Sequence, residues 1–203
     1  MQNFDFQTTR RVVCAPGSIR QLPALARELG MTRALVVTDQ GIFHSGLYAR
    51  CTDALRHGDV DFAVEHNVVA DPPEAIVLEA VTKARALRID GVIGFGGGSS
   101  MDVAKVIATL VPSRQAIAEI YGIGNVRGSR LPLIQIPTTA GTGSEVTPIA
   151  IITTGETTKT GIVSPQLLPD VALLDAELTV GLPADVTAAT GIDAMVHAIE
   201  AYT

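Results

Sequence analysis

Apolar residues in this chain fall into two kinds of pattern that alternate along the sequence. Short segments rich in Val, Ile and Leu, of which residues 34–38 form an uninterrupted β-type run, predict strands at residues 34–38, 60–65, 92–93, 131–136, 146–153, 162–163 and 171–174. Apolar positions three and four residues apart predict helices at residues 19–29, 46–56, 76–87, 101–108 and 182–200. Strands and helices that alternate in this way are typical of a doubly wound α/β fold with a mostly parallel sheet.

Three segments depart from this alternation. Residues 6–15 alternate between apolar and polar positions and predict an edge strand or one arm of a hairpin. Residues 114–130 have mixed signals and several glycines, so we interpret them as an irregular connection. The last predicted helix is followed by no capping residue, which predicts that the chain stops inside a helix.

Composition and charge narrow the possible function classes. The chain has 203 residues, 47% of them hydrophobic, and a net charge of −6. An acidic balance argues against a nucleic-acid partner, which normally meets a basic surface, and no apolar run approaches the roughly 20 residues of a membrane span. Cys14 and Cys51 stand apart, with no metal or redox spacing. We therefore expect a cytoplasmic protein with reduced thiols and no membrane partner.

A glycine-rich turn joins one short apolar run to the helical pattern that follows it. Gly96, Gly97, Gly98 and Ser99 form this turn. Glycines let the backbone approach a phosphate, the free N–H groups at a helix start bind it, and Ser99 or Ser100 would cap the helix or add a donor. The turn matches neither the strict dinucleotide fingerprint, because serine replaces its third glycine, nor a Walker A loop. A plain strand-to-helix turn is the alternative interpretation.

A second unusual loop, with the sequence Pro-Thr-Thr-Ala-Gly-Thr-Gly-Ser-Glu, occupies residues 137–145. It places Thr138, Thr139 and Thr142 at the carboxyl end of a predicted strand, which is where open α/β sheets bind ligands. The density of hydroxyl groups at this position predicts a ligand-binding loop. A solvated Ser/Thr/Gly loop is the alternative.

Near the end of the chain, Asp193 and His197 are four residues apart in a predicted helix, so they share one helical face. A carboxylate and an imidazole on one face can share a divalent cation, but two ligands are too few to hold it. The alternative is a simple Asp–His contact along the helix.

Taken together, these segments resemble the iron-containing (group III) alcohol dehydrogenase family. Three motifs carry the resemblance: GGGSSMDVAK at residues 96–105, IPTTAGTGSEVT at residues 136–147 and TAATGIDAMVHAIEAY at residues 187–202. They occur in the family's order and spacing, and the similarity spans essentially the whole chain. The resemblance implies a Rossmann-like nucleotide-binding domain at residues 1–180. It also implies that residues 181–203 are the first helix of an all-helical metal-binding domain.

The resemblance also implies a set of residues that bind NAD(H). They come from a strand end, the glycine turn, the threonine-rich loop and one lysine: Asp39, Gly96, Gly97, Gly98, Ser99, Thr138, Thr139, Thr142 and Lys159. The glycine turn takes the pyrophosphate, and the threonines lie along the adenosine and phosphates. At Asp39 a carboxylate accepts hydrogen bonds from the ribose hydroxyls and repels a 2′-phosphate, which favours NAD over NADP.

Two further roles follow from the same resemblance. Asp193 and His197 match the first two of four metal ligands, for Fe²⁺ or alternatively Zn²⁺. If the glycine turn binds the cofactor in this way, Asp102, one turn into the helix that follows it, would lie near the nicotinamide behind the groups that contact it, and it is the candidate catalytic residue. An acid that only stabilises the helix N-terminus through the helix dipole is the alternative for Asp102.

The implied activity is that of a metal-dependent alcohol dehydrogenase or aldehyde reductase, which moves a hydride between NAD(H) and a small alcohol or aldehyde. The implied assembly is a homodimer or a higher homo-oligomer. The alternatives are a zinc-dependent relative, such as a glycerol dehydrogenase or a dehydroquinate synthase, and a non-catalytic nucleotide-binding module. The threonine-rich loop and the Asp-x-x-x-His pair fit the iron family better. We expect the chain to be a fragment, inactive by itself, and the identity of the alcohol is left open.

Overall fold

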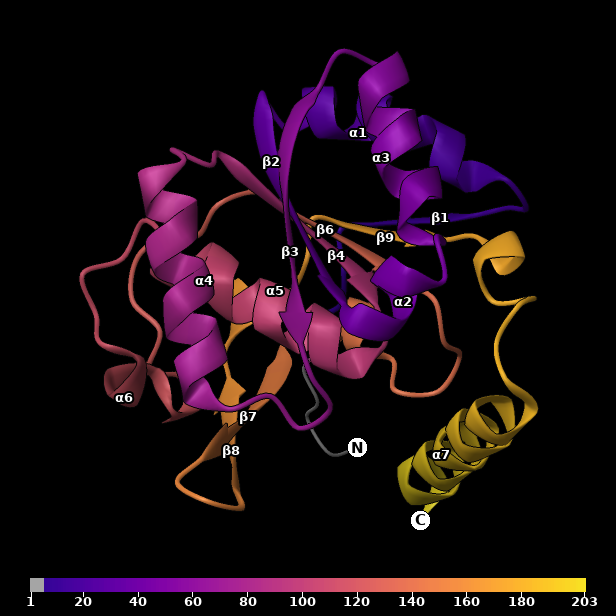
Figure 1. The fold of residues 1–203 in the computed structure, drawn as a ribbon. Helices are drawn as coiled ribbons and strands as arrows, with labels where there is room; N and C mark the ends of the chain where they lie inside the picture. The colour runs from indigo at the N-terminus through magenta and orange to yellow at the C-terminus, as the bar shows by residue number, and fades with distance from the viewer. Residues whose placement is uncertain (1–5) are drawn as a thin grey trace.

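Six strands form the central sheet of the protein, whose computed structural model describes residues 6–203 (Figure 1). Every pairing between these strands is parallel, which confirms the predicted doubly wound α/β, Rossmann-like fold class. In spatial order the strands are β1 (Arg11–Cys14), β9 (Val171–Leu174), β6 (Leu133–Pro137), β4 (Gly91–Gly96), β2 (Arg33–Asp39) and β3 (Asp61–Val68).

Helices cover both faces of the central sheet, because its strands are apolar on both sides. On one face α1 (Leu22–Glu28) and α3 (Tyr48–His57) pack against alternate residues of the strands, such as Val36 of β2. On the other face α4 (Glu74–Ala86) and α5 (Gly98–Leu110) pack against the intervening residues. Figure 1 shows the two helix layers on opposite sides of the strands.

A second, smaller sheet lies on the far side of α5. It consists of β5 (Gly122–Ile123), β8 (Thr158–Val163) and β7 (Ile149–Thr154), and its β7–β8 pairing is antiparallel. The sequence predicted strands here but not a separate sheet. Since α5 is enclosed between the two sheets, ten of its thirteen residues are buried, including Lys105.

The N-terminal segment differs from its prediction in length and in pairing. Strand β1 begins only at Arg11 and pairs parallel with β9 at the sheet edge, so the edge strand is confirmed and the hairpin alternative is wrong. The preceding residues are tied elsewhere, because Thr8 and Thr9 donate hydrogen bonds to the carbonyls of Val146 and Glu145. These side-chain contacts replace ladder pairing in residues 6–10.

Several short elements lie in the connections. Helix α2 (Gln40–His44), which the sequence analysis missed, follows β2 directly, and α6 (Ile117–Ile120) interrupts the segment interpreted as irregular. Single-turn 3-10 helices stand at Ser18–Gln21, Ser144–Val146, Pro165–Leu167 and Ala176–Leu178.

The last helix, α7 (Ala184–Tyr202), lies at the side of the α/β body (Figure 1). It has no buried residue, and Ile192, Met195 and Ile199 are each more than half exposed. Within residues 6–203, no helix combines the length and the apolar character that a bilayer-spanning segment requires.

Candidate functional site

The carboxyl ends of β2 and β4 mark the point at which the topology of the central sheet reverses. From β2 the chain passes outward to β3, returns to β4 and then continues in the opposite direction through β6 and β9. Open α/β sheets bind ligands in the crevice outside such a point. Strand β2 ends at Asp39 and β4 ends at Gly96, so two of the predicted cofactor residues flank it.

The glycine turn and the threonine loop (residues 138–147) lie against each other above this point. Gly96 has a φ of 154°, and a Cβ at this position would lie 2.8 Å from the Cβ of Ser100. A Cβ on Gly98 would lie 2.9 Å from Cγ2 of Thr142 in the facing loop. The fold therefore needs glycine at Gly96, whereas a side chain at Gly98 would displace Thr142, so the two predicted motifs are in contact.

The start of α5 differs from the sequence prediction. Gly97 is the N-cap residue and Gly98 begins the helix, so the prediction that Ser99 or Ser100 caps it is wrong. Ser100 Oγ donates instead to Oδ2 of Asp39, at 3.4 Å. No side chain of residues 6–203 caps α5, so its first-turn N–H groups are available to bind an anion at the turn.

Beside α2 lies a cavity of about 660 Å³, lined by Asp39, Thr138 and Thr139 and, from α3, by Arg50. Asp39 is already fixed there, since its Oδ1 accepts the backbone N–H of Ile42 at 2.9 Å. The hydroxyls of Thr138 and Thr139 are buried and have no hydrogen-bond partner among the described residues. Buried polar atoms normally have partners, so these two hydroxyls fit a polar ligand such as a nucleotide.

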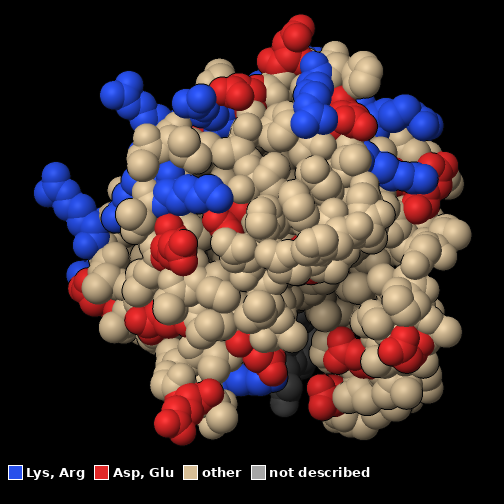
Figure 2. All heavy atoms as spheres, in the orientation of Figure 1, with Lys and Arg blue, Asp and Glu red and all other residues tan. Residues whose placement is uncertain are grey.

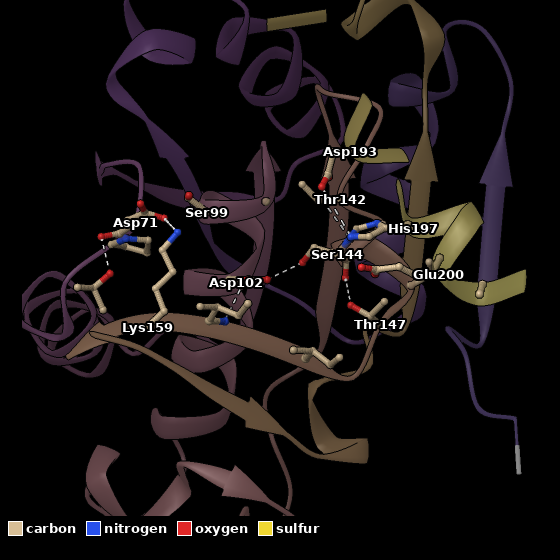
Figure 3. Close-up of a pocket in the computed structure, with 18 residues that line it drawn as sticks. Asp71, Ser99, Asp102, Thr142, Ser144, Thr147, Lys159, Asp193, His197 and Glu200 are labelled. Carbon is tan, nitrogen blue, oxygen red and sulfur yellow. Dashed lines mark hydrogen bonds and ion pairs between the residues drawn. The ribbon is translucent and has the colours of Figure 1, made fainter. Parts of the chain in front are cut away.

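A larger cavity, of about 900 Å³, lies on the other side of the glycine turn (Figure 3). Its walls come from the α/β body and from α7, and Figure 2 shows the hollow between them, with Asp and Glu side chains on the α7 side. The predicted site residues that line it are Gly98, Ser99, Asp102, Thr142, Lys159, Asp193 and His197. The structure thus brings the proposed cofactor turn and the proposed metal ligands to one cavity.

Asp193 and His197 face this cavity from α7 (Figure 3). Oδ1 of Asp193 lies 3.7 Å from Nε2 of His197, and both side chains are about half exposed. A carboxylate oxygen and an imidazole nitrogen are donors that Fe²⁺ and Zn²⁺ accept. Within residues 6–203 no cluster of three or more His, Cys, Asp or Glu residues could hold a metal ion. The pair therefore fits as part of a metal site and does not complete one.

Asp102 lies on the opposite wall, with its carboxylate held on both oxygens. Oδ1 accepts the hydroxyl of Ser144 at 2.6 Å, and Oδ2 accepts the backbone N–H of Ile151 at 2.9 Å. Burial raises the pKa of Asp102, while the nearby Lys105 ammonium and these hydrogen bonds oppose the rise. Because the carboxylate binds β7 and the 3-10 turn at Ser144–Val146, it does more than stabilise the helix N-terminus.

Lys159 reaches the same cavity from the β7–β8 hairpin. Its Nζ forms an ion pair with Oδ1 of Asp71 at 2.7 Å, and both side chains are more than half exposed. Asp71 has a φ of 50°, a left-handed conformation that Asp and Asn tolerate better than most residues. The predicted cofactor lysine is therefore present at the cavity and paired with a carboxylate that sequence analysis did not single out.

Comparison with known proteins settles the family. Residues 9–176 match the family model described as iron-containing alcohol dehydrogenase. The chain belongs to the iron-containing alcohol dehydrogenase family. The resemblance that the three motifs carry is confirmed.

Relatives within the iron-containing alcohol dehydrogenases match over nearly the whole chain. Long-chain-alcohol dehydrogenase 1 of Geobacillus thermodenitrificans is 43% identical over 92% of this chain and 48% of its own length. The solved structure of a 1,3-propanediol oxidoreductase gives a TM-score of 0.95 at 33% identity, over 99% of this chain and 53% of the other. The solved structure of a sulfoacetaldehyde reductase from Bifidobacterium kashiwanohense, in complex with NAD⁺, gives a TM-score of 0.87 at 32% identity. The match covers 95% of this chain and 51% of the other. This chain therefore spans about half the length of the relatives that it matches.

A further residue of this member of the iron-containing alcohol dehydrogenase family was also missed by the sequence analysis. Lys105 is wholly buried, and burial lowers its pKa to about 8 while the Asp102 carboxylate opposes the shift. The signal was available, because Asp102 and Lys105 are three residues apart in the glycine-turn motif and so share one face of a helix. The sequence could not show that a second sheet encloses that face.

Proposed function

We propose that this protein transfers a hydride between NAD(H) and a small alcohol or aldehyde, with the help of a divalent metal. The observation that carries the proposal is the shared cavity, which places Asp102 and Lys159 opposite Asp193 and His197. When bound, the nicotinamide exchanges the hydride, and the metal polarises the substrate oxygen and stabilises its negative charge.

The residues of this chain would bind and orient the dinucleotide along the sheet edge. The first-turn N–H groups of α5 would hold the pyrophosphate at Gly97–Ser99. The unpartnered hydroxyls of Thr138 and Thr139 support an adenosine and phosphate position in the smaller cavity. The larger cavity would then receive the nicotinamide end, near Asp102 and Lys159.

The proposed metal site uses Asp193 and His197 as two ligands, and further ligands would come from protein that follows α7. We propose Fe²⁺ as the metal because the chain belongs to the iron family, with Zn²⁺ as the alternative. Two ligands where a stable site needs about four should bind metal weakly. The apolar side chains exposed on α7 support a second, helical domain that packs against it.

We propose a small alcohol or aldehyde as the substrate class without naming one compound. The relatives named above include a long-chain-alcohol dehydrogenase, a propanediol oxidoreductase and a sulfoacetaldehyde reductase, so the family varies in its substrates. We also propose a homo-oligomer, because β1 leaves one edge of the central sheet without a pairing strand among the described residues. A cytoplasmic location is proposed from the two unpaired cysteines.

The test uses the intact gene product, freed of metal by a chelator and then loaded with Fe²⁺ or Zn²⁺. NAD⁺ reduction with a panel of small alcohols, and NADH oxidation with the matching aldehydes, should depend on the added metal. His197→Ala should abolish turnover and weaken metal binding. His57→Ala is the matched control, because His57 lies in α3 away from the cavity and binds the carbonyl of Asp53. Full activity in His197→Ala would contradict the proposed metal site, and NADH binding without turnover by the metal-loaded protein would favour a non-catalytic module.

A further inference from the structure

Lys105 is a buried cation whose ammonium group donates hydrogen bonds both to the loop that follows β6 and to the start of β7. Its Nζ donates to Oγ of Ser144 at 2.8 Å and to the carbonyl of Ile149 at 2.6 Å, with Oγ1 of Thr147 at 3.4 Å. A charge without solvent contact is costly unless it is hydrogen-bonded, and here all three ammonium protons have acceptors. The side chain therefore ties helix α5 to the threonine loop, but it does not reach the cavity.

The direction of the hydrogen bonds is fixed by chemistry. A lysine ammonium only donates, so Ser144 must accept from Lys105 with a lone pair. The single hydroxyl proton of Ser144 is then free to go to Asp102, whose Oδ1 lies 2.6 Å away. The Lys105 ammonium is itself 3.6 Å from the same oxygen. We call these three residues the buried trio.

The buried trio holds an acidic group at the wall of the larger cavity. The Asp102 side chain is 16% exposed, whereas that of Lys105 is 0% exposed, so only the carboxylate end of the trio can meet a ligand. Ile151 fixes the second carboxylate oxygen. Both oxygens are thus oriented from within the protein, and Asp102 lines the cavity (Figure 3).

We propose that Lys105 and Ser144 are positioning residues, which hold the Asp102 carboxylate in one orientation toward the nicotinamide end of the bound cofactor. This inference rests on the proposed function, because it places the nicotinamide in the larger cavity. It adds that the series Lys105–Ser144–Asp102 couples the threonine loop to the glycine-turn helix. A movement of the threonine loop would then displace the Asp102 carboxylate, which faces the nicotinamide from α5.

The first experiment separates this role from a structural one by comparing two ligands of the intact gene product. ADP-ribose carries the adenosine and pyrophosphate of the cofactor but has no nicotinamide. In Ser144→Ala, kcat and NADH affinity should fall, kcat by roughly 10- to 100-fold, the range for losing a hydrogen bond to a charged group. ADP-ribose affinity should stay within roughly twofold, the usual limit for independent sites. An equal loss of affinity for both ligands would show that the serine only shapes the loop, and would overturn the proposal.

The second experiment asks whether the effect passes through Asp102. In an Asp102→Asn background, adding Ser144→Ala should cause little further loss of kcat, because the carboxylate that it orients is already gone. Thr109→Val is the matched control, since it removes a buried hydroxyl hydrogen bond to the backbone carbonyl of Lys105 without touching its ammonium group, Ser144 or Asp102. Its effect should combine independently with Asp102→Asn. An undiminished effect of Ser144→Ala in the Asp102→Asn background would refute positioning through Asp102.

The hydrogen bonds can also be tested without any turnover. Unfolding of Lys105→Met, Ser144→Ala and the double variant should show coupling, so that the double variant loses less stability than the sum of the two single variants. If the two single losses of unfolding free energy simply add in the double variant, the proposed coupling within the buried trio is overturned. If the wild-type protein turns over no alcohol or aldehyde, the proposed function fails, whereas the unfolding cycle and the contrast between NADH and ADP-ribose affinities still decide the trio.

Discussion

Cofactor choice should depend on the charge of Asp39, and the structure allows that charge to be separated from the residue's other role. Asp39 caps α2 through the N–H of Ile42 and lies in the smaller cavity. Asparagine can accept the same backbone hydrogen bond, so Asp39→Asn removes the charge and keeps the cap. Asp39→Ala removes both, and should cost about 1 kcal/mol of stability that the asparagine variant retains.

The size of the effect follows from the electrostatics of a half-buried carboxylate. Two unit charges about 5 Å apart repel by about 3 kcal/mol at an effective dielectric of about 20, and by less than about 1 kcal/mol in bulk water. Asp39 is partly buried, so we expect a value between these limits. A difference of about 1 to 2 kcal/mol corresponds to a change of roughly 5- to 30-fold in the ratio of NAD to NADP affinity.

The assay is fluorescence titration of the intact gene product with NADH and with NADPH, together with kcat/KM for both oxidised cofactors. Wild type should prefer the NAD form, and Asp39→Asn should gain NADPH affinity. Among the residues that line the same cavity, Arg50 is the cation, so it would be available to a 2′-phosphate. Arg50→Gln in the Asp39→Asn background should therefore remove most of the gain. An unchanged NAD to NADP ratio in Asp39→Asn would refute the reasoning.

The remaining predictions concern charge, metal and assembly. Asp71→Asn should tighten NADH binding, because it releases Lys159 from its ion pair. The gain should be at most roughly fivefold, which is the limit for an exposed ion pair. Weaker NADH binding in a titration would show instead that the ion pair supports cofactor binding. A protein limited to residues 1–203 should bind NADH weakly, hold no stoichiometric iron or zinc and turn over no alcohol, and metal analysis with an activity assay checks this. The intact gene product should be at least a dimer by light scattering at micromolar concentration. Val12 is half exposed on the edge strand β1, so Val12→Lys should weaken the dimer. A monomeric wild-type protein would contradict pairing through this edge. The folded-state pKa of Lys105 is lowered from 10.5 to about 8, so the unfolded state binds more protons between these values. Unfolding free energy should therefore rise with pH across that window, relative to Lys105→Met, and parallel pH profiles would contradict this.

Sequence patterns predicted the parallel sheet because its strands are buried on both faces and read as unbroken apolar runs, as in β2. The same patterns failed where side-chain hydrogen bonds replace the backbone hydrogen bonds between strands. Thr8 and Thr9 have strand-like character, but their hydroxyls bind the carbonyls of a distant loop instead. The short helix α2 was missed because its cap, Asp39, reads equally well as the end of a strand.

The candidate site was predicted in its parts and not in its connections. The glycine turn and the threonine loop were visible because glycine and hydroxyl residues cluster at strand ends. That Ser144 would join Asp102 to Lys105 was not visible, because those contacts span about forty residues of sequence and depend on the second sheet. The pairing of Lys159 with Asp71 was hidden for the same reason, since a local pattern carries no information on long-range contacts.

The enclosure of α5 between two sheets has a consequence for how the cavity responds to a ligand. Amide hydrogens in a doubly covered helix exchange only through large-scale opening, so α5 should be among the slowest-exchanging segments of the protein. Helix α7 has no buried residue and should exchange quickly. One wall is thus ordered before the cofactor arrives, and ligand binding loses little conformational entropy there. The opposite wall, formed by α7, is the part of the site whose motion ligand binding can still change. Slower hydrogen exchange in α7 after ligand addition would report closure of the site.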